Sequence, residues 1–326
     1  MLSEFDLIKQ FFTRTPASRP GRSDLVLGIG DDCALLAPAA GCQMAISSDM
    51  LVEGRHFFAG ADARQLGHKC LAVNLSDLAA MGARPVAFTL ALALPAAESD
   101  WLDDFSKGLF ALADLHDCAL IGGDTTKGPL TICITIFGEI EPGRALRRSA
   151  AMAGDDIWIS GTLGDARLAL AGYRAEVLLA PAALQAASAR MHTPTARVAL
   201  GMALARSGVA HAAIDISDGL VGDLGHVLTA SGVGATIDVD ALPCGPVLSS
   251  QPHALRRQFS AAGGDDYELC FTAPAAARTA IQTLANALDT TVTRVGVIEA
   301  KPGLRLVDGS AQLLDLKLSG FDHFSE

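Results

Sequence analysis

Aspartates beside glycine, serine or threonine recur at six places in the sequence. They lie in the segments GIGDD (28–32), SSDM (47–50), NLSD (74–77), GGDTT (122–126), DISDGL (215–220) and GGDDYE (263–268). Oxygen atoms of carboxylates and other polar groups are the ligands that Mg²⁺ prefers, and substrate phosphates commonly complete its coordination. Several carboxylates placed close together repel one another unless cations or protons offset their charge. Brought into one crevice, these segments would bind divalent metal ions and, through them, a nucleotide polyphosphate.

Taken singly, each segment has a simpler interpretation, because Asp, Gly and Ser are also common in turns and at helix N-termini. Turns elsewhere in the chain use Pro, Ala and Arg, so the recurrence of acidic turns favours metal binding. The first segment is followed by neither the GK[ST] of a P-loop nor a GxGxxG helix signature. We therefore expect phosphates to be held through Mg²⁺ rather than by a lysine.

The remaining reactive side chains give weaker signals. The histidines form neither HxxxH nor HExxH pairs, and no GxSxG or Cys–His pattern indicates a covalent nucleophile. His56 is the one histidine kept as a candidate, because it closely follows the SSD acids. Arg147 and Arg148 are interpreted either as solvated charges or as a clamp on phosphate.

Composition limits the class of protein. The chain has 326 residues, of which 50% are hydrophobic and 19% charged, so it is long enough for two domains with hydrophobic cores. Its net charge of −11 argues against nucleic acid or an anionic membrane as the main partner. The most apolar stretch, residues 86–97, is too short to span a membrane and contains Pro95.

The cysteines and the first residues indicate the compartment. The seven cysteines are scattered, odd in number and without a CxxC pair, which favours reduced thiols over disulfides or a zinc site. The opening residues MLSEFDLIKQFF carry early acids and lack the basic-then-apolar pattern of a signal peptide. We therefore expect a cytoplasmic location.

Hydrophobic periodicity and turn residues predict a mixed α/β chain that holds these acids mostly at strand ends. Ligands bind at such ends in α/β sheets, because the loops there converge. Around 144–155 the sequence changes to a basic run followed by turn residues. We therefore divide the chain into an N-terminal α/β domain at 1–150 and a C-terminal α/β domain at 151–326. We predict helices at 4–12, 62–82, 100–116, 164–173, 181–191, 195–207 and 274–288 and from Asp218, and strands at 25–30, 43–50, 86–94, 118–123, 130–140, 158–161, 212–217, 235–240, 267–273 and 292–299.

In their order along the chain, these motifs resemble those of the thiamine-monophosphate kinase family. The matching segments extend from about residue 4 to the C-terminus and are GIGDDCALL, ISSDMLVEGRHF, KCLAVNLSDLAAMGARP, LIGGDTTKGPL, AIDISDGLVGDLGH, GGDDYELCFT and GFDHF. The wider superfamily includes aminoimidazole ribonucleotide synthetase, selenophosphate synthetase and a hydrogenase maturation factor, which all use ATP through acidic, metal-rich sites. Unlike selenophosphate synthetases, the chain has no cysteine before Cys33. Unlike the hydrogenase maturation factor, it has no cysteine-containing tail.

The resemblance implies transfer of the γ-phosphoryl group of ATP to thiamine phosphate, the last step in making thiamine diphosphate, with several Mg²⁺ ions as cofactors. It implies a two-domain aminoimidazole ribonucleotide synthetase-like fold of the α/β (α+β) class, with ATP between the domains. It also implies a homodimer in which the N-terminal domains pair into a β-barrel-like interface. The partners are then ATP and thiamine phosphate, with neither nucleic acid nor a membrane involved.

Carried over position by position, the resemblance assigns residues to three roles. The metal ligands are Asp32, Ser47, Ser48, Asp49, Asp77, Asp124, Asp215 and Asp218. The nucleotide contacts are Gly123, Asp124, Arg148 and Ser217. The contacts to thiamine phosphate are His56, Asp265 and Phe321, although Phe321 has an alternative role as a C-terminal core residue. Relatives frequently have Ser-Thr-Asp at 47–49, Glu at 265 and another aromatic residue at 321.

The implied chemistry needs no dedicated base or nucleophile. A phosphate acceptor oxygen is already anionic near neutral pH, since its second pKa is about 6, so we expect direct in-line transfer assisted by metal ions. Three alternatives stay open: a ligase-type synthetase with the same acidic site, a metal-dependent phosphohydrolase and a non-catalytic nucleotide sensor. The segment DISDGL differs from the DxDG motif of aspartyl-phosphate phosphatases at Ser217.

Overall fold

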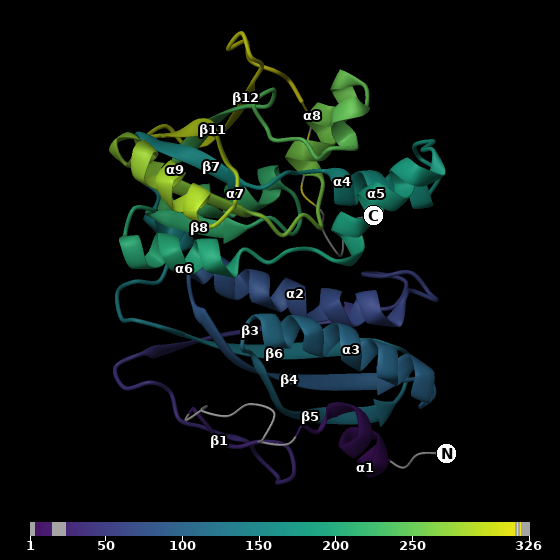
Figure 1. The fold of residues 1–326 in the computed structure, drawn as a ribbon. Helices are drawn as coiled ribbons and strands as arrows, with labels where there is room; N and C mark the ends of the chain where they lie inside the picture. Colours follow the sequence, from purple (N-terminus) through teal and green to yellow (C-terminus); the bar gives the residue numbers. More distant parts are fainter. Residues whose placement is uncertain (1–3, 15–23, 317, 319, 321–326) are drawn as a thin grey trace. The chain divides into compact units, whose positions relative to one another are not determined.

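A computed structural model describes residues 4–14, 24–316, 318 and 320 of the chain (Figure 1). The chain folds into two compact units. The described residues of Met1–Leu78 and Arg84–Gly143 form unit 1, and those of Ala79–Ala83 and Arg144–Glu326 form unit 2. The predicted domain boundary at residue 150 falls inside unit 2, after the chain has left unit 1 at Gly143.

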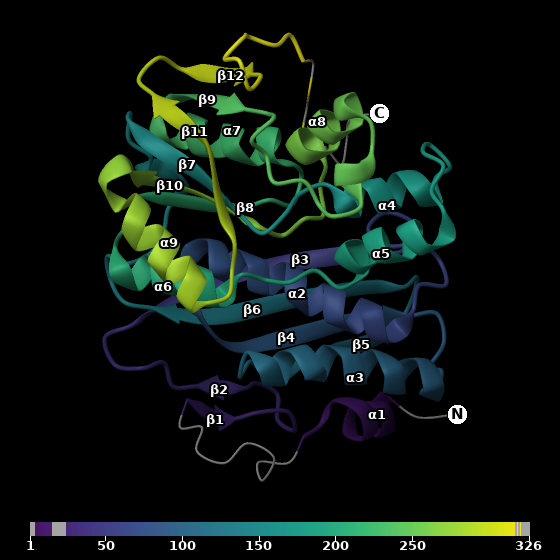
Figure 2. The same ribbon diagram turned by 45° about the horizontal axis from the view of Figure 1, so that its top comes forward.

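Unit 1 is built on a four-stranded sheet and two long helices. These elements are β3 (Gln43–Val52), β4 (Arg84–Leu94), β5 (Ala119–Lys127), β6 (Thr131–Ile140), α2 (Ala63–Met81) and α3 (Ser99–Leu115). The strand order is β3-β6-β4-β5, with β4 and β5 parallel and the other neighbours antiparallel. Both helices cover the same face of the sheet (Figures 1 and 2).

Alternation along the strands separates a covered face of the sheet from an open one. Leu90, Leu92 and Ile134 are buried on the face that carries the helices. Ile46 and Met50 of β3 point from the opposite face and are 61% and 55% exposed. The sheet keeps two edge strands, β3 and β5, so the described chain forms no closed barrel by itself.

Two glycines let α2 and α3 approach each other closely. A Cβ atom at Gly108 would lie 1.9 Å from the carbonyl oxygen of Arg64, and one at Gly67 would lie 2.1 Å from that of Phe105. Any side chain at these positions therefore forces the two helices apart. This contact holds α2, which carries the NLSD segment, in a fixed place over the sheet.

Short elements precede the sheet of unit 1. They are α1 (Glu4–Leu7), a π-helix (Ile8–Phe12), β1 (Leu25–Leu27) and β2 (Leu35–Leu36). β1 and β2 pair antiparallel and pack against buried residues of the sheet. The strand expected at 25–30 ends at Leu27, and Gly30 has a φ of 128°, which a strand does not contain. The GIGDD segment is therefore a loop between β1 and β2.

Unit 2 is built on a six-stranded sheet. Its strands are β7 (Asp155–Ser160), β8 (Ala212–Asp215), β9 (Gly234–Asp238), β10 (Leu269–Pro274), β11 (Val292–Glu299) and β12 (Gly303–Val307), in the order β12-β9-β11-β7-β10-β8. Only β12 and β9 are parallel neighbours. The helices are α4 (Asp165–Tyr173), α5 (Pro181–His192), α6 (Val198–Ser207), α7 (Leu220–Ser231), α8 (His253–Ala262) and α9 (Arg278–Ala287).

The main core of unit 2 lies between the sheet and α7. Leu224 and Val227 of α7 are buried against Ile157 and Ile214 of the sheet. Trp158 of β7 and Phe271 of β10 lie directly opposite each other, and their rings stack with the centroids 6.3 Å apart. The packing of α7 fixes the loop between β8 and α7, which carries the DISDG segment.

Sequence periodicity missed two elements of unit 2. The strand expected at 292–299 is not the last one, because β12 follows it at the edge of the sheet. The helix α8 was also missed, since its buried residues are only Phe259, Ser260 and Ala261. Both elements are short, with five residues in β12 and ten in α8, so a period has few residues in which to appear.

We expect Gly108→Ala to lower the stability of the protein by about 1–3 kcal/mol, because the added methyl group overpacks the contact between α2 and α3. Gly225→Ala is the matched control, since a Cβ atom there meets no atom within 4 Å. Alanine is the better helix former, so this change should stabilise α7 by up to about 1 kcal/mol. Thermal unfolding measures both, and equal melting temperatures for Gly108→Ala and wild type would contradict the close packing.

Candidate active site

Unit 1 brings three predicted metal ligands together from a strand and a helix. Ser47 and Asp49 lie two residues apart on β3, so both side chains are on the face of the sheet that carries the helices. The Ser47 hydroxyl donates a hydrogen bond to the carboxylate of Asp77 on α2. The Ser47 and Asp77 oxygen atoms are therefore in contact, and Asp49 lies on the same face of the sheet as Ser47.

Ser48 is turned to the other face of β3. Its hydroxyl lies 3.0 Å from the Thr135 hydroxyl and donates to the Ile134 carbonyl at 3.2 Å. Strand alternation therefore separates the Ser48 hydroxyl from the group formed by Ser47, Asp49 and Asp77. The role of Ser48 as a metal ligand stays a prediction, and its hydroxyl faces away from the side chains of Ser47 and Asp49.

Asp124 and Asp32 lie in exposed positions of unit 1. Asp124 follows Gly123 on β5, where a Cβ atom at Gly123 would lie 1.8 Å from the Leu90 carbonyl oxygen. Only glycine fits this close pairing of β5 with β4, and its φ of 148° fits glycine alone. In the GIGDD loop, the Asp31 carboxylate accepts a hydrogen bond from the N–H of Asp32 at 2.9 Å. Asp31 therefore stabilises the turn that presents Asp32.

His56 lies just beyond the end of β3. Its Nδ1 accepts a hydrogen bond from the main-chain N–H of Val52 at 3.0 Å. An Nδ1 that accepts carries no proton, so the neutral ring has its hydrogen on Nε2. The chain turns back here through Gly54, whose φ is 77°. The turn thus fixes both the place and the tautomer of His56.

In unit 2, one buried carboxylate organises the DISDG loop. Oδ2 of Asp223, in the first turn of α7, accepts hydrogen bonds from the main-chain N–H groups of Ser217, Asp218 and Gly219 at 3.0, 3.1 and 3.1 Å. No role was predicted for Asp223 from the sequence. An aspartate in the first turn of a helix, five residues after another aspartate, is the signal that could have found it.

The acids around this loop are crowded. Burial and the neighbouring charge of Asp215 raise the pKa of Asp223 to about 7, and the charge of Asp218 acts in the same direction. Such crowding is what a divalent cation relieves, and oxygen donors are the ligands that Mg²⁺ takes. The residues present therefore fit a Mg²⁺ ion at Asp215 and Asp218.

The GGDDYE segment is bonded to the DISDG loop through the main chain. The N–H groups of Asp265 and Tyr267 donate to the carbonyls of Ser217 and Ile216, both at 2.8 Å, and the N–H of Ile216 donates to the Glu268 carbonyl at 2.8 Å. Asp265 and Tyr267 have φ values of 68° and 51°, a left-handed conformation that side chains rarely adopt. The two loops therefore form one interlocked unit.

The other two acids of the GGDDYE segment are structural. The buried carboxylate of Asp266 accepts the N–H of Gly164 at 2.9 Å, and burial raises its pKa well above the usual range. Glu268 is fully buried and accepts hydrogen bonds from Arg190, Arg197 and the Ser160 hydroxyl. Sequence motifs gave no means of separating these acids from Asp265.

Two further predicted contacts are Arg148, for the nucleotide, and Phe321, for thiamine phosphate. Arg148 is exposed, and its main-chain carbonyl accepts the hydroxyl of Ser231, at the end of α7, at 2.8 Å. Phe321 lies outside the described residues. Among the described residues, no three His, Cys, Asp or Glu side chains converge closely enough to form a ready-made metal site.

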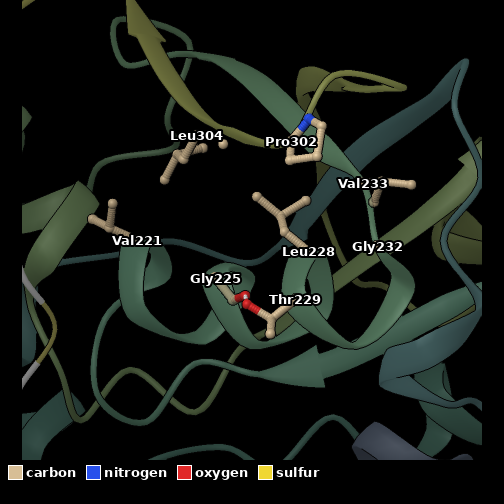
Figure 3. A pocket seen from close by; sticks show the side chains of 9 residues that line it. Val221, Gly225, Leu228, Thr229, Gly232, Val233, Pro302 and Leu304 are labelled. Carbon is tan, nitrogen blue, oxygen red and sulfur yellow. Dashed lines mark hydrogen bonds between the residues drawn. The ribbon is translucent and has the colours of Figure 1, made fainter.

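A cavity in unit 2 is distinct from all of these residues. It has a volume of about 350 Å³ and lies between α7 and β12 (Figure 3). Its lining is mostly apolar and includes Val221, Leu228 and Leu304. None of the predicted metal, nucleotide or thiamine phosphate contacts lines it. This cavity is therefore not the candidate site.

Comparison with known proteins covers nearly the whole chain. Models of AIR synthase related proteins match residues 30–140 (N-terminal domain) and 152–309 (C-terminal domain). The thiamine-monophosphate kinases of Salmonella typhimurium and Escherichia coli K12 are 46% and 45% identical to this chain, over 99% of it and 98% of each relative.

Solved structures agree with these relatives. The thiamine-monophosphate kinase of Stenotrophomonas maltophilia matches with a TM-score of 0.86 and 48% identity, over 95% of this chain and 98% of its own. AaThiL, complexed with AMPPCP and TMP, matches with a TM-score of 0.75 and 28% identity, over 88% and 89%. The mixed α/β, two-domain fold is thus the one expected. The chain belongs to the AIR synthase related proteins and, among them, to the thiamine-monophosphate kinase family.

Proposed function

We propose that this chain transfers the γ-phosphoryl group of ATP to thiamine phosphate and yields thiamine diphosphate and ADP. The observation that carries the proposal is the identity of 46% over 99% of the chain to a thiamine-monophosphate kinase. The acidic loops support it, because their donor atoms suit a metal-bound polyphosphate and no lysine-bearing P-loop is present in the sequence.

The proposed cofactor is Mg²⁺, and each unit carries proposed ligands of its own. In unit 1 these are Ser47, Asp49 and Asp77, together with Asp32 and Asp124, and in unit 2 they are Asp215 and Asp218. When bound, Mg²⁺ neutralises phosphate charge and aligns the phosphates for in-line displacement. Ser48 is proposed as a further ligand from unit 1, with its hydroxyl on the other face of β3 from Ser47 and Asp49.

Several of the proposed substrate contacts belong to the two interlocked loops of unit 2, and others belong to unit 1. Gly123, Arg148 and Ser217 contact ATP, and His56, Asp265 and Phe321 contact thiamine phosphate. The thiazolium ring is cationic, so a carboxylate and an aromatic face suit it. Tyr267 donates a hydrogen bond to the Asp265 carboxylate at 3.3 Å, which orients it.

The proposed reaction is a direct transfer between two phosphate groups. The acceptor oxygen is anionic at neutral pH, so no residue needs to remove a proton from it. The work of the chain is to hold two anions in line and to exclude a competing water molecule. With a γ-phosphate that is chiral at phosphorus, we expect inversion of configuration, and retention would contradict direct transfer.

Product analysis tests the activity. With wild-type protein, Mg²⁺ and ATP, we expect release of ADP when thiamine phosphate is added and a much slower release with free thiamine. With thiamine phosphate, thiamine diphosphate should form together with the ADP. Inorganic phosphate released from thiamine phosphate without ATP would support a phosphohydrolase instead, and no turnover at all would support a nucleotide sensor.

The two neighbouring aspartates of the GIGDD loop should differ in their effect on activity. Asp32→Asn removes a proposed metal ligand, and we expect kcat/KM to fall on the order of 100-fold or more, the loss typical of removing one group that stabilises transition-state charge. Asp31→Asn is the matched control, because the amide oxygen can still accept the N–H of residue 32. Equal losses in the two variants would contradict the assigned roles.

We also propose that the chain forms a homodimer through the open face of the unit 1 sheet. The face exposes Ile46 and Met50, large apolar side chains that a second copy would cover. Sheets that pack face to face form such interfaces, and two open sheets together can build a barrel-like arrangement.

Sedimentation equilibrium tests the dimer. We expect wild-type protein at twice the chain mass of 33.7 kDa and the double variant Ile46→Glu/Met50→Glu at 33.7 kDa. Leu178→Glu is the control, because Leu178 is 93% exposed and belongs to unit 2. A wild-type monomer, or dissociation caused equally by the control, would contradict this interface.

The cytoplasmic location stays a prediction. Among the described residues, none of the helices is both long and apolar enough to cross a membrane. All seven cysteines are free thiols in the structure.

A further inference from the structure

Arg190 connects α5 to the loop that carries Asp265. It lies in the last turn of α5, and its side chain is 20% exposed. Its Nη2 donates one hydrogen bond to the main-chain carbonyl of Asp266 at 3.0 Å and another to the Glu268 carboxylate at 2.8 Å. The Asp266 carbonyl lies between the two left-handed residues of the loop, Asp265 and Tyr267.

Glu268 fixes the orientation of Arg190. Its side chain has no exposed surface, and its two oxygen atoms also accept two hydrogen bonds from Arg197, both at 2.6 Å. The Ser160 hydroxyl donates to Glu268 at 2.6 Å and accepts the N–H of Leu269 at 2.8 Å. A buried carboxylate with this many charged and neutral donors has little freedom. The guanidinium of Arg190 is therefore held toward the loop.

The loop needs such support from outside. Left-handed backbone is unfavourable for residues other than glycine, so surrounding bonds must maintain it at Asp265 and Tyr267. The N–H groups of these two residues are held by the carbonyls of Ser217 and Ile216. The carbonyl between them accepts a hydrogen bond from the guanidinium of Arg190.

We infer that Arg190 is a positioning residue for thiamine phosphate: its bond to the Asp266 carbonyl sets the direction in which Asp265 faces the substrate. The inference rests on the proposed function, in which Asp265 contacts thiamine phosphate. Arg190 itself does not touch the substrate in this account. Loss of its bond lets the loop relax toward ordinary backbone angles and moves the Asp265 carboxylate away from its binding position.

Steady-state kinetics of Arg190→Met test this inference. Methionine keeps an apolar stem and removes both hydrogen bonds. We expect KM for thiamine phosphate to rise by about tenfold to 100-fold, the cost of misplacing a contact by about 1 Å, with a smaller change in KM for ATP. Arg190→Lys keeps the charge and one donor, so its KM for thiamine phosphate should lie between those of wild type and Arg190→Met.

Arg278→Met is the matched control. Arg278 shares the buried carboxylate of Asp156 with Arg294, as Arg190 shares Glu268 with Arg197, but this second cluster does not contact the loop. We expect Arg278→Met to lower the melting temperature and to keep the wild-type KM for thiamine phosphate.

Two results would overturn the inference. One is an unchanged KM for thiamine phosphate in an active Arg190→Met or Arg190→Lys protein. The other is an equal rise of KM in Arg278→Met, which would show that general loss of stability is the cause. A wild-type protein that makes no thiamine diphosphate would instead overturn the proposed function. If Arg190→Met does not fold, Arg190→Lys still decides through its KM.

Discussion

The compensation of closely spaced carboxylates is the constraint on which this structure depends. An ionised carboxylate that leaves water needs hydrogen-bond donors or cations, because desolvation and repulsion by its neighbours raise its free energy. The chain meets this need in several ways. Asp223 receives three main-chain N–H groups, Glu268 receives two arginines, and Asp77 receives the Ser47 hydroxyl. Asp215 and Asp218, which are proposed to bind metal, lie close to Asp223.

The compensated acids shape the loops that carry the others. Asp223 folds the DISDG loop around its own carboxylate, and Glu268 orients Arg190 toward the loop of Asp265. Three main-chain hydrogen bonds then join these two loops. One motif thus contains both an acid that builds the loop and an acid that the loop presents.

The sequence predicts much of the fold, because elements such as α3 and β6 have a buried face whose period is visible. It does not separate Asp265 from Asp266 and Glu268, since burial and the positions of two arginines distinguish them and neither is local in sequence. Asp223 was missed because its donors are main-chain groups, which any sequence supplies. The orientation of Ser48 depends on the register of β3, and the motif alone does not contain it.

Thermal unfolding at increasing MgCl₂ concentration tests most directly whether the acidic loops are built for a divalent cation. An ion that binds the native carboxylates stabilises the fold by roughly 2.7 kcal/mol at about 100 times its Kd. We expect the melting temperature to rise with MgCl₂ and to rise much less with NaCl of equal ionic strength. The same rise with both salts, or no rise with either, would contradict it.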